Sequence, residues 1–464
     1  MYLRNKQNMR CGRLAVLLCV MAFACTAFAQ VTLLVEEPFG HFGAFTATGH
    51  AAVYLSRICA SSPTILRRCE PGEPGVVISR YNKVGGRDWI AIPLMPYLYA
   101  VETVDDVPLF VDAKVIAFLR NDYRRRHLED VAPDRADGEP PEGNWTQLVG
   151  SAYDRLIYGF EIDSSEEQDD EFIREYNARP NQPRFNLLVH NCADFARGVV
   201  NFYDPKAVGR NWVADVGITT PKQLAKSLTK YSKRHPELEL STFVIPQVPG
   251  VVERSTQVRG VLESLLKSKK YLLPLAVFHP IVTGVAAVVY IGDGRFDPGR
   301  NAMVMDPAQG LQSPLTAEQR HFYQEELNKL LAEGNPGLKA LQSKRAWTTL
   351  ASEPRLDAGG GPVLKIRSGE KSVEMGLSRN NLVRSNVPPA LTEELLTARL
   401  LQELRNGSGA SQRSVEKDWN LLEQLLADAS KASPVCDRHD GATCVRGGLE
   451  QSGLRESASA AALR

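Results

Sequence analysis

One stretch, FNLLVHNCADFAR at residues 185–197, decides how this chain folds and what chemistry it offers. Its first five residues are mostly apolar and predict an extended lead-in. Cys192, Phe195 and Val199 then recur at helical spacing, and Asn191 belongs to the residue types that cap helix N-termini. The sequence therefore predicts a helix that begins at Cys192.

The position of Cys192 makes it a candidate nucleophile. A thiol at a helix start meets unpaired backbone N–H groups and the positive end of the helix dipole, which favour the thiolate. The thiolate is the form that attacks carbonyl groups, and the N–H groups beside the cap residue Asn191 are candidates to bind an oxyanion. The alternative is a buried cysteine that acts only as a small apolar side chain.

A nucleophilic thiol needs a base, and His50 is the first candidate. It opens the strand-like segment HAAVYL at residues 50–55, whose alternation puts Ala52 and Tyr54 on the same face as the imidazole. His190 ranks second, because residues next to each other at a helix start usually point apart. We expect the nucleophile helix to cover the face that carries His50. We also expect the pair to favour a thiolate and an imidazolium, with the pKa of the thiol lowered.

These two motifs resemble those of the circularly permuted papain-like thiol hydrolases. Lecithin:retinol acyltransferase and its bacterial relatives, distant kin of peptidoglycan-cleaving cysteine endopeptidases, have a similar histidine strand and Asn-Cys-x-x-Phe helix start. The resemblance covers roughly residues 40–205. It implies an α+β fold in which the nucleophile helix packs on an antiparallel sheet, with Cys192 as nucleophile and His50 as base. It also implies a third polar residue on the next strand, where this chain has Ser79 and Tyr81.

Residues 1–29 have the pattern of a secretory signal peptide. Basic residues precede an apolar run at 14–24, and Ala27-Phe28-Ala29 matches the small-x-small pattern of a cleavage point. The alternative is an uncleaved anchor helix, although the apolar run is short for a span of ~20 residues. We therefore expect an exported protein of the periplasm or cell envelope, with a mature chain that begins near Gln30.

The cysteines fit an exported chain. Of the eight cysteines, three precede residue 30, and cleavage would leave the others in an oxidising compartment where disulfides persist. Proximity in the sequence predicts that Cys59 pairs with Cys69 and Cys436 with Cys444, which leaves Cys192 as a free thiol. No second pair of cysteine or histidine residues has metal-site spacing, so the sequence predicts neither a metal site nor a cofactor.

The chain divides into a papain-like domain at 30–247 and two further regions. A linker at 248–310 contains the uncharged segment 271–292, which is long enough to be a transmembrane helix. Two prolines weaken that interpretation and leave a buried or interfacial hairpin as the alternative. Residues 311–464 form a mostly helical C-terminal region. Its expected elements are helices at 316–332, 392–405 and 414–429, a hairpin that joins 363–366 to 372–375, and a disordered tail from 447.

Charge and composition narrow the function. The 55 basic and 54 acidic side chains balance to +1, which argues against a nucleic-acid partner. We expect a cysteine hydrolase or acyltransferase that attacks an amide or ester carbonyl through Cys192 and His50. A cell-wall peptide suits an exported enzyme, whereas a lipid or acyl substrate and membrane association suit the apolar segment. The alternatives are a catalytically inactive papain-like binding module and a membrane-associated structural protein.

Overall fold

The structure is a computed structural model of the whole chain. It describes residues 29–40, 48–82, 84–293, 295–333, 352–368, 371–382, 387, 389–405 and 409–431. Residues 1–28 of the expected signal peptide, the expected Cys436–Cys444 pair and the expected disordered tail lie outside the described residues.

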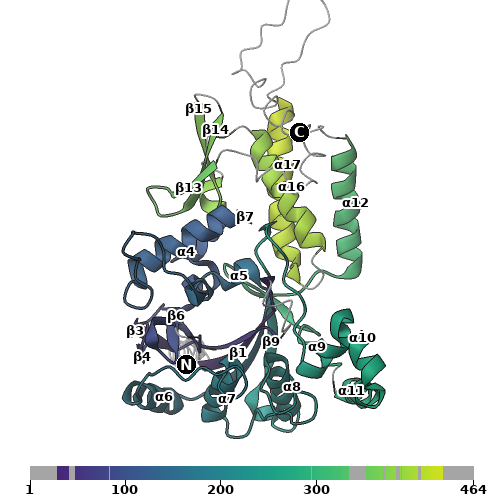
Figure 1. Cartoon of the computed structure of the whole chain (residues 1–464). Coiled ribbons are helices and arrows are strands. Elements are labelled where there is room, and N and C mark those ends of the chain that lie inside the picture. The colour runs from purple at the N-terminus through teal and green to yellow at the C-terminus, as the bar shows by residue number, and fades with distance from the viewer. Residues whose placement is uncertain are drawn as a thin grey trace, which may run out of the picture.

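A mixed sheet of eight strands forms the centre of the molecule (Figure 1). Its order is β12-β11-β9-β8-β1-β2-β5-β6, and neighbours are antiparallel except for the parallel pair β9 and β11. The strands are β1 (Ala29–Glu36), β2 (His50–Leu55), β5 (Val76–Ser79), β6 (Ile90–Pro93), β8 (Ile157–Ser164), β9 (Ser241–Ile245), β11 (Met303–Asp306) and β12 (Gly310–Gln312). The sheet thus extends beyond the expected domain boundary at residue 247, because β11 and β12 add to the edge at β9.

Each face of the sheet has its own core, because side chains alternate along the central strands. On β1, Leu33 and Val35 pack in the core beneath α6 (Glu166–Ala178), α7 (Cys192–Tyr203) and α8 (Pro221–Ser232). Leu34 faces the other core, which contains residues of α3 (Leu94–Tyr99), α4 (Ala113–His127) and α5 (Ser151–Asp154). The helix that begins at Cys192 is therefore packed on a largely antiparallel sheet, as the sequence predicts for an α+β chain.

The C-terminal helices belong to the second core. They are α12 (Ala317–Glu333), α15 (Arg379–Leu382), α16 (Pro389–Arg405) and α17 (Gln412–Lys431), near the expected helices. Leu395 and Leu400 of α16 share a core with Val115 and Leu119 of α4. The buried Arg399 donates a hydrogen bond of 2.6 Å to the backbone oxygen of Leu109. The two halves of the chain are thus joined by apolar packing and by a buried polar contact.

The remaining elements are short. They are the strands β3 (Ile58–Ser62), β4 (Ile65–Arg68), β7 (Val111–Asp112), β10 (Gly250–Val251), β13 (Ser352–Leu356), β14 (Pro362–Ser368) and β15 (Lys371–Gly376), and the 3-10 helices η1 (Val84–Gly86), η2 (Val104–Asp106), η3 (Asn144–Gln147) and η4 (Pro236–Leu238). The hairpin β14–β15 lies where the sequence predicts one, and β13 adds a third strand to it.

The uncharged segment 271–292 is not one continuous helix. It follows α9 (Val261–Lys267) and divides into α10 (Lys269–Phe278) and α11 (Pro280–Asp293), with a break at His279. Pro280 starts the second helix, and a proline cannot donate the backbone hydrogen bond that a helix interior requires. Among the described residues, no helix has both the length and the apolar character that a membrane span requires. The segment therefore forms two helices, α10 and α11, and not one long helix over 271–292.

Candidate functional site

Asn191 caps α7, as its residue type predicts. Its Oδ1 accepts a hydrogen bond of 2.9 Å from the backbone N–H of Asp194, and the carboxylate of Asp194 accepts one of 3.4 Å from the backbone N–H of Asn191. The Asn191 amide also donates to the backbone oxygens of Leu187 and Thr219, at 3.1 and 3.0 Å. The Asn191 side chain is therefore occupied by its structural contacts, so that at the start of α7 backbone N–H groups are the candidates to bind an oxyanion.

The segment before α7 is a turn, not the expected extended lead-in. The backbones of Asn186 and His190 exchange two hydrogen bonds, of 3.1 and 3.0 Å, and the side chain of Asn186 accepts a further bond from the N–H of Leu188. Among the described residues, the only β-type pairing of this apolar run is the bridge between Asn186 and His190 themselves. Without a neighbouring strand, Asn186 closes a turn. His190 is exposed on this turn and does not line the cavity described below, which leaves His50 as the base candidate.

His50 lies at the start of β2 on the face away from α7. Ala51 and Val53 belong to the core under α7, Ala52 belongs to the opposite core, and alternation places His50 with Ala52. The expectation that α7 covers the face of His50 is therefore wrong.

The sulfur of Cys192 reaches β2 at the end of the strand. Pairing between β2 and β5 covers only Val53 to Leu55 of β2, so the start of β2 lacks this neighbour. There the backbone N–H of Ala51 donates a hydrogen bond to the sulfur of Cys192. The sulfur thus contacts the residue next to His50, at the start of β2, where β5 does not pair with the strand.

Ser79 determines the tautomer of His50. The Ser79 hydroxyl donates its only hydrogen to the backbone oxygen of Ala51, at 2.8 Å, and the same oxygen lies 2.9 Å from Nε2 of His50. Because the hydroxyl hydrogen is already used, Nε2 must donate its own hydrogen to Ser79. The imidazole is therefore protonated at Nε2, and Nδ1 is its basic nitrogen.

Tyr81 stacks on the same imidazole. The two rings lie 5.3 Å apart between centroids at an interplanar angle of 25°, and Tyr81 is buried. Of the two candidates for the third polar position, Ser79 makes the hydrogen bond and Tyr81 packs against the ring. Together they fix the orientation of His50.

A buried charged pair that the sequence reasoning missed lies beside His50. Glu36 pairs with His50 across β1 and β2, and its carboxylate accepts hydrogen bonds from Arg155, at 2.8 Å, from Ser151, at 2.9 Å, and from the hydroxyl of Tyr97. Burial alone would raise the pKa of Glu36, but Arg155 and these hydroxyls lower it, so the carboxylate is charged. The available signal was a glutamate that directly follows the apolar run of β1.

Burial shifts the pKa values of both the half-buried Cys192 and the buried His50 toward their neutral forms. It raises the pKa of the Cys192 thiol, an effect larger than the lowering by the Ala51 N–H and by Arg155. It also lowers the pKa of His50 to about 4, although Glu36 acts in the opposite direction. These pKa directions do not favour the expected resting thiolate and imidazolium, because desolvation acts on both groups more strongly than the helix start and Glu36 do.

Cys192 and His50 line one cavity of about 740 Å³. Its wall includes Ser264 and Leu265 of α9, together with Arg155 and Tyr81. Apolar lining residues are Phe39, Phe185, Leu187, Leu188, Ile218, Val261 and Leu265. The cavity is large enough for a small substrate and brings a thiol, an oriented imidazole and helix-start N–H groups to one place.

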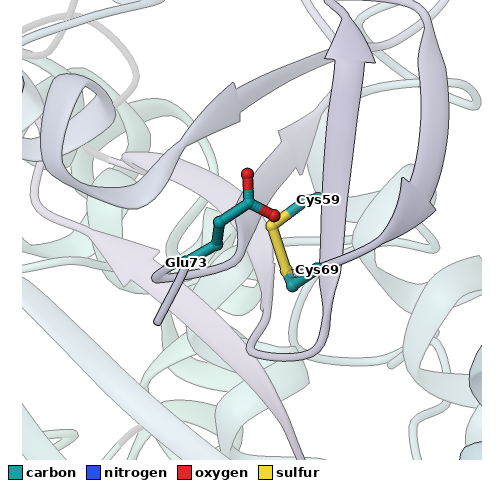
Figure 2. Close-up of side chains that lie close together, drawn as sticks. All are labelled: Cys59, Cys69 and Glu73. Carbon is teal, nitrogen blue, oxygen red and sulfur yellow. A yellow bond between two sulfur atoms is a disulfide. The ribbon is translucent and has the colours of Figure 1, made fainter. Parts of the chain in front are cut away.

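The expected disulfide between Cys59 and Cys69 is present, with a Cα–Cα distance of 4.8 Å. It links β3 to the residue after β4, and Cys192 is the free cysteine of the described residues. Figure 2 shows the carboxylate of Glu73 beside the bonded sulfurs. The cluster of Cys59, Cys69 and Glu73 has no free thiolate to bind a metal, because the two sulfurs are bonded to each other. Glu73 is paired with Arg67 through hydrogen bonds of 2.6 and 2.7 Å.

No protein-family model, curated protein or solved structure was found to match the chain.

Proposed function

We propose that the protein is an exported cysteine hydrolase or acyltransferase in which Cys192 is the nucleophile and His50 the general base. One observation carries the proposal: Cys192 and His50 line the same cavity, and the hydrogen bond from Nε2 of His50 to Ser79 leaves Nδ1 as the basic nitrogen. A thiol, an oriented base and an orienting hydroxyl are the parts that nucleophilic catalysis requires.

The reaction begins with attack of the Cys192 sulfur on an ester or amide carbonyl. Nδ1 of His50 accepts the thiol proton as the C–S bond forms, and backbone N–H groups at the start of α7 stabilise the oxyanion. The tetrahedral intermediate expels an alcohol or amine, which takes the proton from His50, and a thioester on Cys192 remains. Water then releases a carboxylic acid, or a second alcohol or amine accepts the acyl group.

The pair rests in its neutral form, and this form sets the starting point of the proton transfer. Because burial lowers the pKa of His50 to about 4, the imidazole is unprotonated at neutral pH and ready to accept a proton. The thiol also keeps its proton until a substrate arrives, because burial raises the pKa of Cys192. Proton transfer must then be coupled to attack on the carbonyl, because an imidazole with a pKa of about 4 is a weak base for a thiol whose pKa is raised.

Export and substrate class are further parts of the proposal. The signal-peptide pattern and the Cys59–Cys69 disulfide favour an oxidising compartment such as the periplasm. The apolar cavity wall favours acyl groups, and a cell-wall peptide is the alternative substrate. The raised pKa of Cys192 is the observation that favours the second candidate function, an inactive binding module that keeps the cavity.

A chromogenic ester separates the two candidate functions. With p-nitrophenyl acetate and p-nitrophenyl octanoate, we expect turnover that is abolished in Cys192→Ala and reduced by a factor of about 10²–10⁴ in His50→Ala, the range for loss of a general base. His190→Ala is the matched control and should retain full activity, because that side chain is exposed on the turn before α7. Equal rates in all four proteins would leave the binding module as the better account.

A further inference from the structure

Among the described residues, the cavity wall has positive charge but no carboxylate. Three arginines line it, and two of them are paired with buried acids behind the wall. Arg80 donates two hydrogen bonds to Asp88, at 2.8 and 2.7 Å, and Arg155 donates one to Glu36 at 2.8 Å. The third is Arg259.

Arg259 has no acceptor among the described residues. The half-buried side chain forms no ion pair or hydrogen bond there, and its Nε is buried without an acceptor. It follows the fully buried Val258 and precedes α9, so the backbone on both sides is held in place. The undescribed residues 41–47, which lie between lining residues in the sequence, contain no Asp or Glu. A buried donor without an acceptor costs free energy, and a bound oxyanion would satisfy it.

We propose that Arg259 binds an anionic group of the substrate, a carboxylate or a phosphate, while the apolar wall holds an acyl or other apolar part. The guanidinium matches both oxyanions because its N–H groups can donate in pairs. This inference rests on the proposed function, since it assigns the substrate of the same cavity to amphiphilic anions.

Two alkylating reagents that differ only in charge test the subsite. Iodoacetate is an anion and iodoacetamide is neutral, and both modify a reactive thiol at Cys192. We expect Arg259→Gln to lower the ratio of the iodoacetate rate to the iodoacetamide rate by about tenfold, the effect of one charge-assisted hydrogen bond. Arg259→Lys should keep part of the ratio. Arg295→Gln, which removes an exposed arginine after α11, should leave it unchanged.

A binding measurement keeps the test independent of thiol reactivity. Octyl phosphate and octanoate should each raise the melting temperature of Cys192→Ala, and Arg259→Gln in that background should abolish the shift. A larger shift with one ligand distinguishes a phosphate from a carboxylate as the natural group. An unchanged alkylation ratio together with equal melting shifts in the two backgrounds would overturn the subsite. A Cys192 that resists both reagents while the ligands still bind through Arg259 would instead contradict the proposed catalysis.

A second inference comes from α10 and α11, which Figure 1 shows grouped with α9 at one side of the molecule. Most outward side chains of this helical pair are apolar, although the exposed His279 lies at the break between the helices. The largest exposures flank this break, at Phe278 (75%) and Ile281 (81%). The other exposed apolar residues of the pair are Leu273, Val277, Val282, Val285, Val288 and Ile291. Residues 271–292 contain no charged side chain. A surface helix normally shows the reverse pattern, with polar residues outward.

We infer that this apolar face docks on the surface of an anionic lipid bilayer, with the turn between α10 and α11 inserted into one leaflet. Three lysines, at 267, 269 and 270, directly precede the uncharged segment in the sequence, and Lys267 also pairs with Glu263 at 2.6 Å. Basic residues at this place are expected where a helix enters an anionic headgroup layer. At 10 and 14 residues, each helix is about 15–21 Å long, shorter than the ~30 Å hydrocarbon core. The exposed turn can insert into a soft lipid phase. A contact with a flat protein surface would instead be expected to have a polar rim around its apolar centre.

The docking face continues toward the cavity. Val261 and Leu265 of α9 line the cavity wall, and α10 begins two residues after α9 ends. Docking through α10 and α11 would therefore bring the cavity close to the bilayer surface.

Vesicle sedimentation tests the lipid surface. The full chain should pellet with vesicles of phosphatidylethanolamine and phosphatidylglycerol, and Phe278→Asp combined with Ile281→Asp should reduce the bound fraction at least tenfold. Both proteins keep the apolar N-terminal run, so the difference in bound fraction reports on the docking face.

Phe322→Asp on α12, where the side chain is 56% exposed, is the matched control and should bind like the wild type. Cys192→Ala should also bind, because docking does not depend on catalysis. Equal binding of the wild type and the double variant would overturn the inference. A wild type that is oligomeric, with a double variant that is monomeric, would also overturn it, because the apolar face would then be a contact between copies of the chain.

Discussion

At the scale of single residues, the identity of Ser79 explains the state of His50. A hydroxyl that donates to the Ala51 carbonyl can only accept from Nε2 of His50, so the base nitrogen is fixed without a carboxylate. The sequence predicted a third polar residue on this strand but not which of Ser79 and Tyr81 it is. Both point to the same side of β5, and only the structure shows that one bonds the imidazole and the other stacks on it.

Ser79→Ala should therefore act through the orientation of His50. We expect kcat/KM for the p-nitrophenyl esters to fall about 10–100-fold with KM nearly unchanged, because the imidazole loses its fixed tautomer but the cavity remains. Steady-state kinetics measure both constants. Ser61→Ala, on the exposed edge of β3, serves as the control. A loss confined to KM would show that Ser79 contributes to binding and not to the base.

Burial of His50 also makes the stability of the protein depend on pH. The pKa of His50 is about 4 in the folded protein and about 6.5 in the unfolded chain, so below pH 6.5 the unfolded chain takes up a proton that the folded protein does not. The free energy of unfolding should fall by about 3 kcal/mol between pH 6.5 and 4 relative to His50→Gln. Urea titrations at several pH values measure it. Parallel pH curves for the two proteins would contradict the buried neutral imidazole.

At the scale of elements, local sequence signals predicted where helices begin better than they predicted which strands pair and which face of a strand a helix covers. Asn191 and the spacing of Cys192, Phe195 and Val199 located the start of α7 correctly. The apolar run before it was misread, because apolar character alone cannot say whether a neighbouring strand exists. The face of His50 was also misjudged: alternation gives two faces, and the sequence does not tell which face a distant helix covers.

Asn191→Ala should destabilise the protein more than loss of an ordinary cap. Removing a cap costs about 1 kcal/mol, and here the Thr219 and Leu187 carbonyls also lose their donor, so we expect about 2–3 kcal/mol. Ser165→Ala removes the exposed capping box of α6 and should cost about 1 kcal/mol. Chemical denaturation compares the two. A smaller loss for Asn191→Ala than for Ser165→Ala would contradict the anchoring role of the cap.

At the scale of the whole molecule, the two halves of the chain form one packed unit. The sequence predicted the C-terminal helices from their periodicity, but it placed a boundary at residue 247 because the contacts across it are distant in sequence. Strands β11 and β12 complete the main sheet, and Arg399 of α16 joins Asp418 of α17, at 2.7 Å, to the Leu109 carbonyl. Such pairings follow from the packing of whole layers and leave no local pattern.

Arg399→Met should weaken this unit strongly. It leaves the fully buried Asp418 without one of its two arginine partners, and breaking a buried pair typically costs 3–5 kcal/mol. We expect a single unfolding transition with a midpoint at a lower denaturant concentration than in the wild type. Circular dichroism and tryptophan fluorescence monitor this transition. Arg355→Met on β13, an exposed arginine, should change stability little. Two separate transitions in the wild type would contradict one cooperative unit.

The most direct test of the account is whether Cys192 carries the acyl group. After rapid mixing with p-nitrophenyl octanoate and acid quenching, peptide mass analysis should find an octanoyl thioester on the peptide that contains Cys192. The adduct should form at least about 100-fold more slowly in His50→Ala, the effect of losing a general base. An octanoyl group found only on other residues, or formed at the same rate without His50, would contradict the catalytic pair.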